Sequence, residues 1–207
     1  MTTPPPISQA EHNRQTRDAY DRLAAVWQAQ WLLDQGAEVI GADLSPRMIE
    51  EARHRCQGRG RFIVADLAKP LPVGPRSLDG ITSSLALHYV RDWSVPLRSF
   101  AAALRPAGWA VISLDHPFSP RLPGQRGGYF DTELVADSWR KADIEVSQRF
   151  WKRPLSAVAD AFADAGFAID RIAEPRPSRE AIERYPSELA GTADIPGFIV
   201  YRLRLAG

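Results

Sequence analysis

The sequence predicts an α/β protein built on a mostly parallel sheet with helices on both faces. Short apolar runs alternate along the chain with segments in which apolar residues recur every three or four positions. This alternation is typical of parallel sheets, because parallel strands need a helix-sized crossover between them. Three of the runs end in a polar side chain, at Asp43, Asp66 and Ser83. The carboxyl ends of such strands are where open α/β sheets bind their ligands.

The predicted elements begin with a Pro-rich flexible tail at residues 1–7. A helical pattern then runs over residues 8–35, with Trp27 and Trp31 on its apolar face, so we expect both tryptophans in the core. Strands are predicted at residues 37–42, 61–65, 78–83, 109–114, 167–173 and 198–205.

Helices are predicted between these strands. One begins after Ser45, a good N-cap residue followed by a proline, and another ends at Gly166. Region 118–153 breaks the alternation, because it combines Pro and Gly with six aromatic side chains. We predict that it is an insertion over one end of the sheet, shaped as a small hairpin lid. No second domain is indicated, so residues 1–207 are interpreted as one domain.

Composition narrows the class of protein. A net charge of +1 does not indicate the excess of basic residues that is typical of proteins that bind nucleic acid. No run is long enough to span a membrane, and the start of the chain does not read as a signal peptide, so the cytoplasm is the default location. Cys56 is the single cysteine, expected to be buried and inert, and no cluster has metal-ligand spacing. The oligomeric state is open.

Four segments in order carry a family resemblance. They read GAEVIGADLSPRMIEEA, FIVADL, LDGITSSLALHYVRDW and LRPAGWAVISLDHP. In this order they resemble the motifs of class I S-adenosylmethionine-dependent methyltransferases, and most of all the small-molecule and quinone-type group. The resemblance implies a Rossmann-like sheet with an antiparallel last strand. It also implies S-adenosyl-L-methionine as cofactor and a small molecule as methyl acceptor.

The resemblance also implies roles for residues at the strand ends. Asp43 would bind the ribose hydroxyls of the cofactor, and Asp66 would accept a hydrogen bond from its adenine amino group. The adenosine would lie along residues next to these two, and the methionine part would be flanked by two serines at the end of the third strand. The implied cofactor residues are Asp43, Leu44, Ser45, Met48, Asp66, Leu67, Ser83 and Ser84.

The acceptor side is less sharply indicated. His88 and Tyr89 would face the transferred methyl group and the substrate, and His116, just past a strand end, is a second candidate for proton transfer. Tyr129 and Trp151 of the insertion are candidate substrate contacts. Each residue also has an ordinary structural interpretation: turn residues for the aspartates, caps for the serines, and packing for the histidines and aromatics.

One departure from the family pattern is large. The first motif, a strand and a glycine-rich loop leading into a helix, is missing before the WLLDQG segment at residues 31–36. The helical stripe passes through this junction without a turn signal, which favours an internal deletion over a diverged, reduced sheet. The predicted function is therefore a small-molecule methyltransferase that is impaired by the loss of the loop. A non-catalytic weak binder or partner subunit is the alternative, and an NAD(P)-dependent oxidoreductase ranks lower because the dinucleotide fingerprint is absent.

Overall fold

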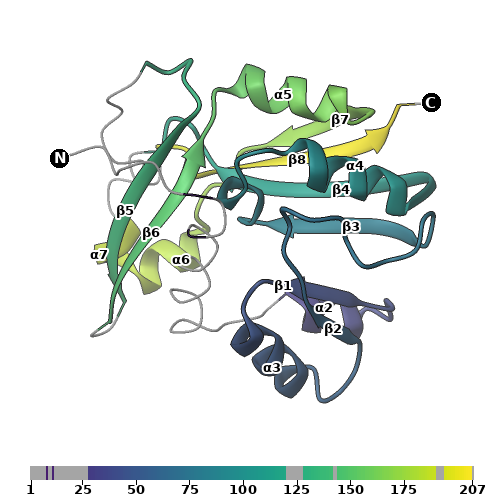
Figure 1. Cartoon of the computed structure of the whole chain (residues 1–207). Coiled ribbons are helices and arrows are strands. Elements are labelled where there is room, and N and C mark those ends of the chain that lie inside the picture. Colours follow the sequence, from purple (N-terminus) through teal and green to yellow (C-terminus); the bar gives the residue numbers. More distant parts are fainter. Residues whose placement is uncertain are drawn as a thin grey trace.

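The computed structural model describes residues 28–119, 128–141, 144–189 and 194–206, together with Ser8 and Glu11. Its strands form two separate sheets and a hairpin, as Figure 1 shows. The predicted tail at 1–7, and most of the predicted helix at 8–35 including Trp27, lie outside the described residues.

The smaller sheet pairs β1 (Ile40–Asp43) with β2 (Arg61–Val64) in parallel. Helices α2 (Gln28–Asp34) and α3 (Pro46–Arg55) accompany it. The strands approach closely at Gly41, where a Cβ atom would lie 2.6 Å from Cδ1 of Phe62. A small core results, made of Ala29, Ile49, Ala52, Cys56 and Phe62.

The larger sheet has the strand order β3 (Leu78–Ser84), β4 (Leu104–Asp115), β8 (Phe198–Leu205) and β7 (Phe167–Ala173). Strands β3 and β4 are parallel, and β8 runs antiparallel to both of its neighbours. The antiparallel last strand is therefore confirmed.

The main core lies between this sheet and two helices, α4 (Ser94–Ala103) and α5 (Leu155–Asp164). Both helices cover the same face of the sheet in Figure 1, where Phe162 of α5 packs with Trp93 and with Tyr201 of β8. Helix α5 ends at a glycine with φ of +81°, Gly166, as its position in the sequence predicted.

The region predicted as an insertion contains a hairpin, β5 (Glu133–Lys141) paired antiparallel with β6 (Ile144–Lys152). Strand β6 lies against a short 3-10 helix, η1 (Leu87–Tyr89), which follows β3. Two further short helices, α6 (Arg179–Arg184) and α7 (Pro186–Leu189), were not predicted.

Three sequence-based expectations need correction. Trp31 is 63% exposed, because Ala29 and Leu33 are the α2 residues that meet the small core. Strand β1 begins three residues later than predicted, at Ile40. Strand β4 begins earlier, at Leu104, because the turn residues through Ala107, which has φ of +66°, stay within the strand.

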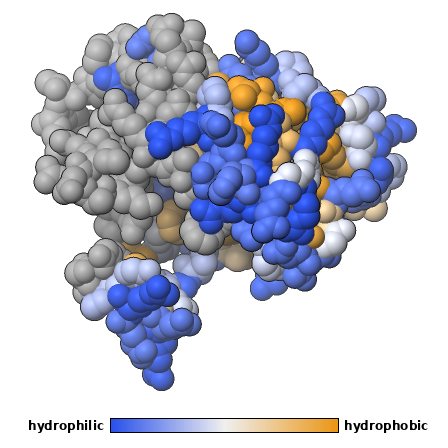
Figure 2. All heavy atoms as spheres, turned by 90° about the horizontal axis from the view of Figure 1, so that it is seen from below, coloured by the Kyte–Doolittle hydropathy of each residue, from blue (hydrophilic) through white to orange (hydrophobic). Residues whose placement is uncertain are grey.

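In Figure 1 the smaller sheet, with β1 and β2, lies beyond the β3 edge of the larger sheet. Within the described ranges, β1 pairs with β2 alone and β3 pairs with β4 alone. From below, the described surface is largely hydrophilic with one apolar area (Figure 2). Large apolar side chains that stay exposed on the smaller unit are Trp31, Ile40 and Val64.

Candidate functional site

Two carboxylates lie at the carboxyl edge of the smaller sheet. Asp43 ends β1, and Asp66 follows β2 by two residues. The Oδ1 atom of Asp43 accepts a hydrogen bond from the Ser45 amide at 2.8 Å, and Oδ1 of Asp66 accepts one from the Ala68 amide at 2.9 Å. Each carboxylate is thus oriented by the turn that follows its strand.

The residues around these carboxylates have two structural roles: one caps helix α3, and another connects the two units. Ser45 is fully buried, and its hydroxyl accepts a hydrogen bond from the Met48 amide at 3.0 Å, so it serves as the N-cap of α3. Met48 is buried and Leu44 is half-buried at the same end of the helix. Leu67 packs against the main core instead, so this short stretch connects the smaller unit to the larger one.

The end of β3 carries the two serines. Ser83 is 7% exposed, and its hydroxyl has no hydrogen-bond partner among the described residues. Ser84 is exposed, and its Oγ lies 3.2 Å from Oγ of Ser113 on β4. Leu85 then adopts φ of +49°, which bulky side chains rarely do. This sharp bend directs the chain from β3 into η1, where His88 lies.

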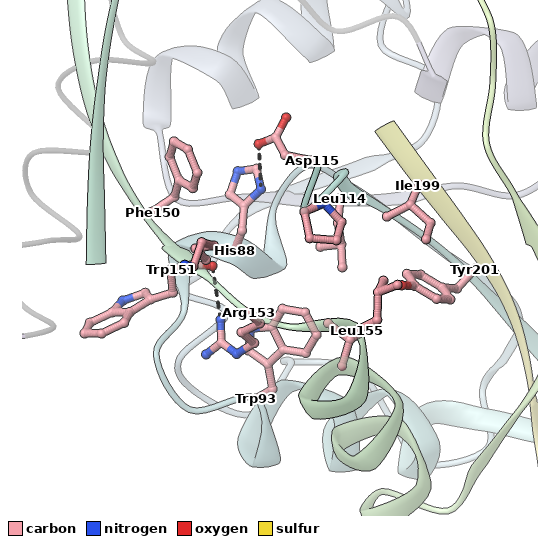
Figure 3. A pocket seen from close by; sticks show the side chains of 13 residues that line it. His88, Trp93, Leu114, Asp115, Phe150, Trp151, Arg153, Leu155, Ile199 and Tyr201 are labelled. Atoms are coloured by element: carbon pink, nitrogen blue, oxygen red, sulfur yellow. Dashed lines mark hydrogen bonds and ion pairs between the residues drawn. The ribbon is translucent and has the colours of Figure 1, made fainter. Parts of the chain in front are cut away.

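His88 is 6% exposed and lies close to a carboxylate. Its Nδ1 is 3.4 Å from Oδ2 of Asp115 at the end of β4, and the pair is drawn in Figure 3. The imidazole contacts the rings of Tyr89, at 4.3 Å between centroids, and Phe150, at 5.3 Å. Tyr89 is held in turn by its hydroxyl, which donates to Oε1 of Gln148 at 2.7 Å.

A small pocket with a volume of about 30 Å³ adjoins His88. Its walls come from η1, the end of β4, the hairpin strand β6, the start of α5 and β8 (Figure 3). The lining residues are His88, Trp93, Leu114, Asp115, Pro117, Phe150, Trp151, Lys152, Arg153, Leu155, Val158, Ile199 and Tyr201. Apolar and aromatic walls with a few polar groups are typical of small-molecule sites.

Two cationic side chains that line the pocket, Lys152 and Arg153, already have partners within the protein. Lys152, 4% exposed, lies 3.0 Å from Oε1 of Glu133 and donates to the carbonyl of Gly128. Arg153 donates to the backbone carbonyls of Val90 and Arg91 and covers the ring of Trp93 at 4.4 Å. Burial lowers the pKa of the Arg153 guanidinium to about 10.

Of the other predicted site residues, only some lie at the pocket. Trp151 lines the pocket, with the Arg91 guanidinium 5.2 Å from its ring. His116 and Tyr129 are not among the lining residues. His116 is buried, with Nδ1 accepting from the Phe118 amide at 3.1 Å and Nε2 2.9 Å from Oε1 of Glu174, so both ring nitrogens have structural partners.

Tyr129 has a structural role as well. Its hydroxyl accepts a hydrogen bond from the Leu155 amide at 3.1 Å, and its ring stacks on Phe118 at 5.2 Å. The sequence did not single out Asp115, Arg153 or Tyr201. Asp115 could have been identified from the sequence, because it is adjacent to His116 in the LDHP segment. Tyr201 lies inside the apolar run FIVYRLRL, which gives no sign of a role at the pocket.

The part of the chain that the structure covers holds no group of three or more potential metal ligands. None of its helices is both long and apolar enough to cross a membrane.

Comparisons with known proteins point to one family. Residues 24–112 match the family described as methyltransferase domain. An S-adenosylmethionine-dependent methyltransferase of Mesorhizobium loti superposes with a TM-score of 0.67 at 28% identity, over 86% of this chain and 85% of that one. Residues 24–112 are thus similar to a methyltransferase domain, and the fold is that of S-adenosylmethionine-dependent methyltransferases. This likeness implies S-adenosyl-L-methionine as the cofactor.

Two further proteins are similar, one in fold and one in part of the sequence. A second solved structure, a putative S-adenosylmethionine-dependent methyltransferase of Listeria monocytogenes, gives a TM-score of 0.70 at 20% identity, over 87% of this chain and 86% of that chain. A demethylmenaquinone methyltransferase of Thermus thermophilus is 37% identical over 90 residues, which is 42% of this chain and 40% of that protein. The chain thus spans about two fifths of the length of this curated relative.

Proposed function

We propose that this chain transfers a methyl group from S-adenosylmethionine to a small molecule. The observation that carries the proposal is the position of Asp43 and Asp66 at the carboxyl ends of adjacent parallel strands, where Asp43 pairs in register with Val64. Open α/β sheets bind nucleotides at this edge, with a carboxylate on the ribose hydroxyls. The quinone-type methyltransferases among the relatives support a small-molecule acceptor.

The residues fit the two halves of the cofactor differently. Asp43, Asp66 and the apolar side chains of Leu44 and Met48 suit an adenosine. For the methionine half, the described residues before β1 offer helix α2 and no glycine-rich loop. Binding is therefore proposed to rest mainly on the adenosine contacts, with Ser83 and Ser84 at the edge of β3 nearest the methionine part.

When bound, the cofactor supplies an electrophilic methyl group. The chain itself would hold the acceptor in line in the pocket, which supplies much of the rate of such a transfer. His88 would take the proton from the acceptor's nucleophile through Nε2, while Asp115, acting as a positioning residue, holds the Nδ1 side of the ring. His116 is a weaker candidate, because both of its nitrogens have structural partners.

The test is titration calorimetry with S-adenosylhomocysteine on the intact chain and on Asp43→Asn. Loss of a charge-assisted hydrogen bond costs about 1.5–3 kcal/mol, so the variant should bind roughly 10- to 100-fold more weakly. Asp79→Asn is the matched control, because Asp79 is exposed at the start of β3 and pairs with Arg105. No heat at millimolar ligand, or equal affinities for all three proteins, would refute the proposal.

A second candidate function, a non-catalytic binder, is favoured by the interruption between β1 and β3. An unpaired strand edge at a ligand site weakens the backbone contacts that a nucleotide needs. Inserting a strand, a glycine-rich loop and a helix start before Trp31 separates the two candidates. A gain of tenfold or more in affinity for S-adenosylhomocysteine supports the non-catalytic form, whereas turnover by the unaltered chain excludes it.

A further inference from the structure

The pocket beside His88 is too small for an organic methyl acceptor. Its volume is about 30 Å³. A cavity of this size holds about two water molecules, because each needs roughly 10–15 Å³. His88 itself is only 6% exposed. Methyl transfer to a small molecule at this histidine therefore requires one wall of the pocket to move.

The wall formed by strand β6 is the one that can move. The walls from β4, β8 and α5 belong to the main core, through Leu114, Ile199 and Val158. Phe150 of β6 is buried at the pocket but belongs to neither hydrophobic core. Among the described elements, β6 lies mainly against its partner β5 and against η1. A two-stranded hairpin has little stability of its own, so β5 and β6 can move while the main core stays packed.

Side chains on one face of β6 close the pocket. Alternate residues of a strand point to the same face, which here carries Gln148, Phe150 and Lys152. The Phe150 ring lies 5.3 Å from the His88 ring between centroids, as Figure 3 shows, and covers it. Nearer the turn of the hairpin, Oε1 of Gln148 accepts a hydrogen bond from the Tyr89 hydroxyl at 2.7 Å. This bond ties the hairpin to η1 beyond the point where Phe150 covers His88.

The other end of β6 is firmly attached. Lys152 is 4% exposed and lies 3.0 Å from Oε1 of Glu133, its register partner on β5. Separating a buried ion pair is costly, so the two strands should move together. Arg153, the next residue, donates to the carbonyls of Val90 and Arg91. The base of the hairpin is therefore the pivot, and the Gln148 end is free to swing once its bond to Tyr89 breaks.

We propose that the β5–β6 hairpin is a lid over the His88 pocket, closed in this structure, and that the Tyr89–Gln148 hydrogen bond is its latch. Breaking the latch lets the hairpin pivot near Arg153, lifts Phe150 from His88 and opens the pocket to the methyl acceptor. The inference rests on the proposed function, because it describes how that site admits its acceptor. The opening itself needs no ligand.

The test measures how often His88 becomes accessible to diethyl pyrocarbonate, a reagent that acylates exposed imidazoles and is too large for the closed pocket. Modification of each histidine is followed by peptide mass spectrometry. His54, exposed on α3, gives the rate for an open imidazole. His116, which is 3% exposed and does not line the pocket, reports any loosening of the rest of the fold.

The variants remove the latch from either side. Lids open in microseconds to milliseconds, so modification over minutes follows the open fraction. Tyr89→Phe and Gln148→Met should each raise the rate at His88 about 5- to 30-fold, as expected for one hydrogen bond in a buried site, and leave His116 within about twofold. The double variant should be no faster than the faster single variant, because both changes remove the same bond. Tyr185→Phe, at an exposed tyrosine, is the matched control.

Four outcomes would overturn the latch: wild-type His88 reacting as fast as His54, unchanged rates in both single variants, equal acceleration at His88 and His116, or additive effects in the double variant. The measurement uses neither cofactor nor acceptor, so it is independent of the proposed function. Absence of S-adenosylhomocysteine binding would refute that function and leave the His88 rates as they are. Unchanged His88 rates would refute the latch and leave cofactor binding intact.

Discussion

The His88–Asp115 pair is the residue-scale feature on which the proposed chemistry depends. A separation of 3.4 Å between Nδ1 and Oδ2 is long for a hydrogen bond but usual for a catalytic pair before its ligand is bound. Because general-base catalysis contributes about 10²–10⁴-fold, His88→Gln should lower kcat for methyl transfer by that order.

The measurement is transfer of labelled methyl groups, with His54→Gln as control, since His54 is exposed on α3. Asp115→Asn should lower kcat less than His88→Gln and should shift the pH profile of kcat, because it changes how the imidazole is held rather than removing it. A His88→Gln enzyme with wild-type kcat would show that the histidine only packs.

Tyr201 gives a pH dependence of stability. Its pKa in the folded protein is about 12, raised by burial from an ordinary value of about 10. Above pH 10 the unfolded chain loses this proton while the folded chain keeps it, so stability falls as pH rises from 10 to 12. Two pKa units set a ceiling of about 3 kcal/mol on this loss.

Denaturant unfolding of the wild type and of Tyr201→Phe between pH 8 and pH 11 checks this. The variant should lack this part of the decline, so the stability of the wild type should fall relative to that of the variant as pH rises. Tyr185→Phe should keep the full decline. Parallel curves for wild type and Tyr201→Phe would contradict the raised pKa.

At the scale of elements, Arg153 fixes the hairpin to the body of the molecule. It follows β6, and its guanidinium donates to the carbonyls of Val90 and Arg91 in the loop between η1 and α4. Lysine has no planar fork to serve two carbonyls and to stack on Trp93. Arg153→Lys should therefore cost about 1–2 kcal/mol of stability and reduce the near-ultraviolet dichroism of Trp93.

Arg98→Lys is the control for this substitution, because Arg98 is exposed on α4. Thermal unfolding followed by near-ultraviolet dichroism measures both effects. An Arg153→Lys protein as stable as the control would show that β6 is held by its apolar contacts alone.

Most elements could be predicted from local pattern. Strands β7 and β8 have their predicted bounds, and Ser45 caps α3, because apolar runs and capping residues act within a few positions. The prediction that Trp31 is buried was wrong, because its burial depends on how α2 packs against the small core. Periodicity does not determine that packing. Asp115 and Tyr201 meet at the pocket only through the pairing of β4 with β8, which no local signal records.

At the scale of the whole molecule, the two cores are separate. The smaller one contains Cys56, which is fully buried, and burial raises the pKa of its thiol, so the thiol reacts only when that core opens. The larger one contains Trp93 and Phe162. Because the smaller core has far fewer buried residues, it should open at a lower free energy than the larger one.

Labelling of Cys56 by a thiol reagent, compared with unfolding followed by Trp93 fluorescence, measures the two free energies. Phe162→Leu is the discriminating variant. It should weaken the larger core by about 1 kcal/mol or more and leave the labelling rate of Cys56 in native buffer nearly unchanged. Equal free energies in the wild type would show that both cores unfold as one cooperative unit.

The break between β1 and β3 has a thermodynamic consequence for any ligand that spans it. The smaller unit carries Asp43 and the larger carries Ser83 and His88, and no described backbone hydrogen bond joins β1 to β3. A nucleotide touching both would act as a cross-link and would spend part of its binding free energy on fixing their relative orientation. Its apparent affinity would then report the coupling between two halves of the molecule as much as the quality of either site.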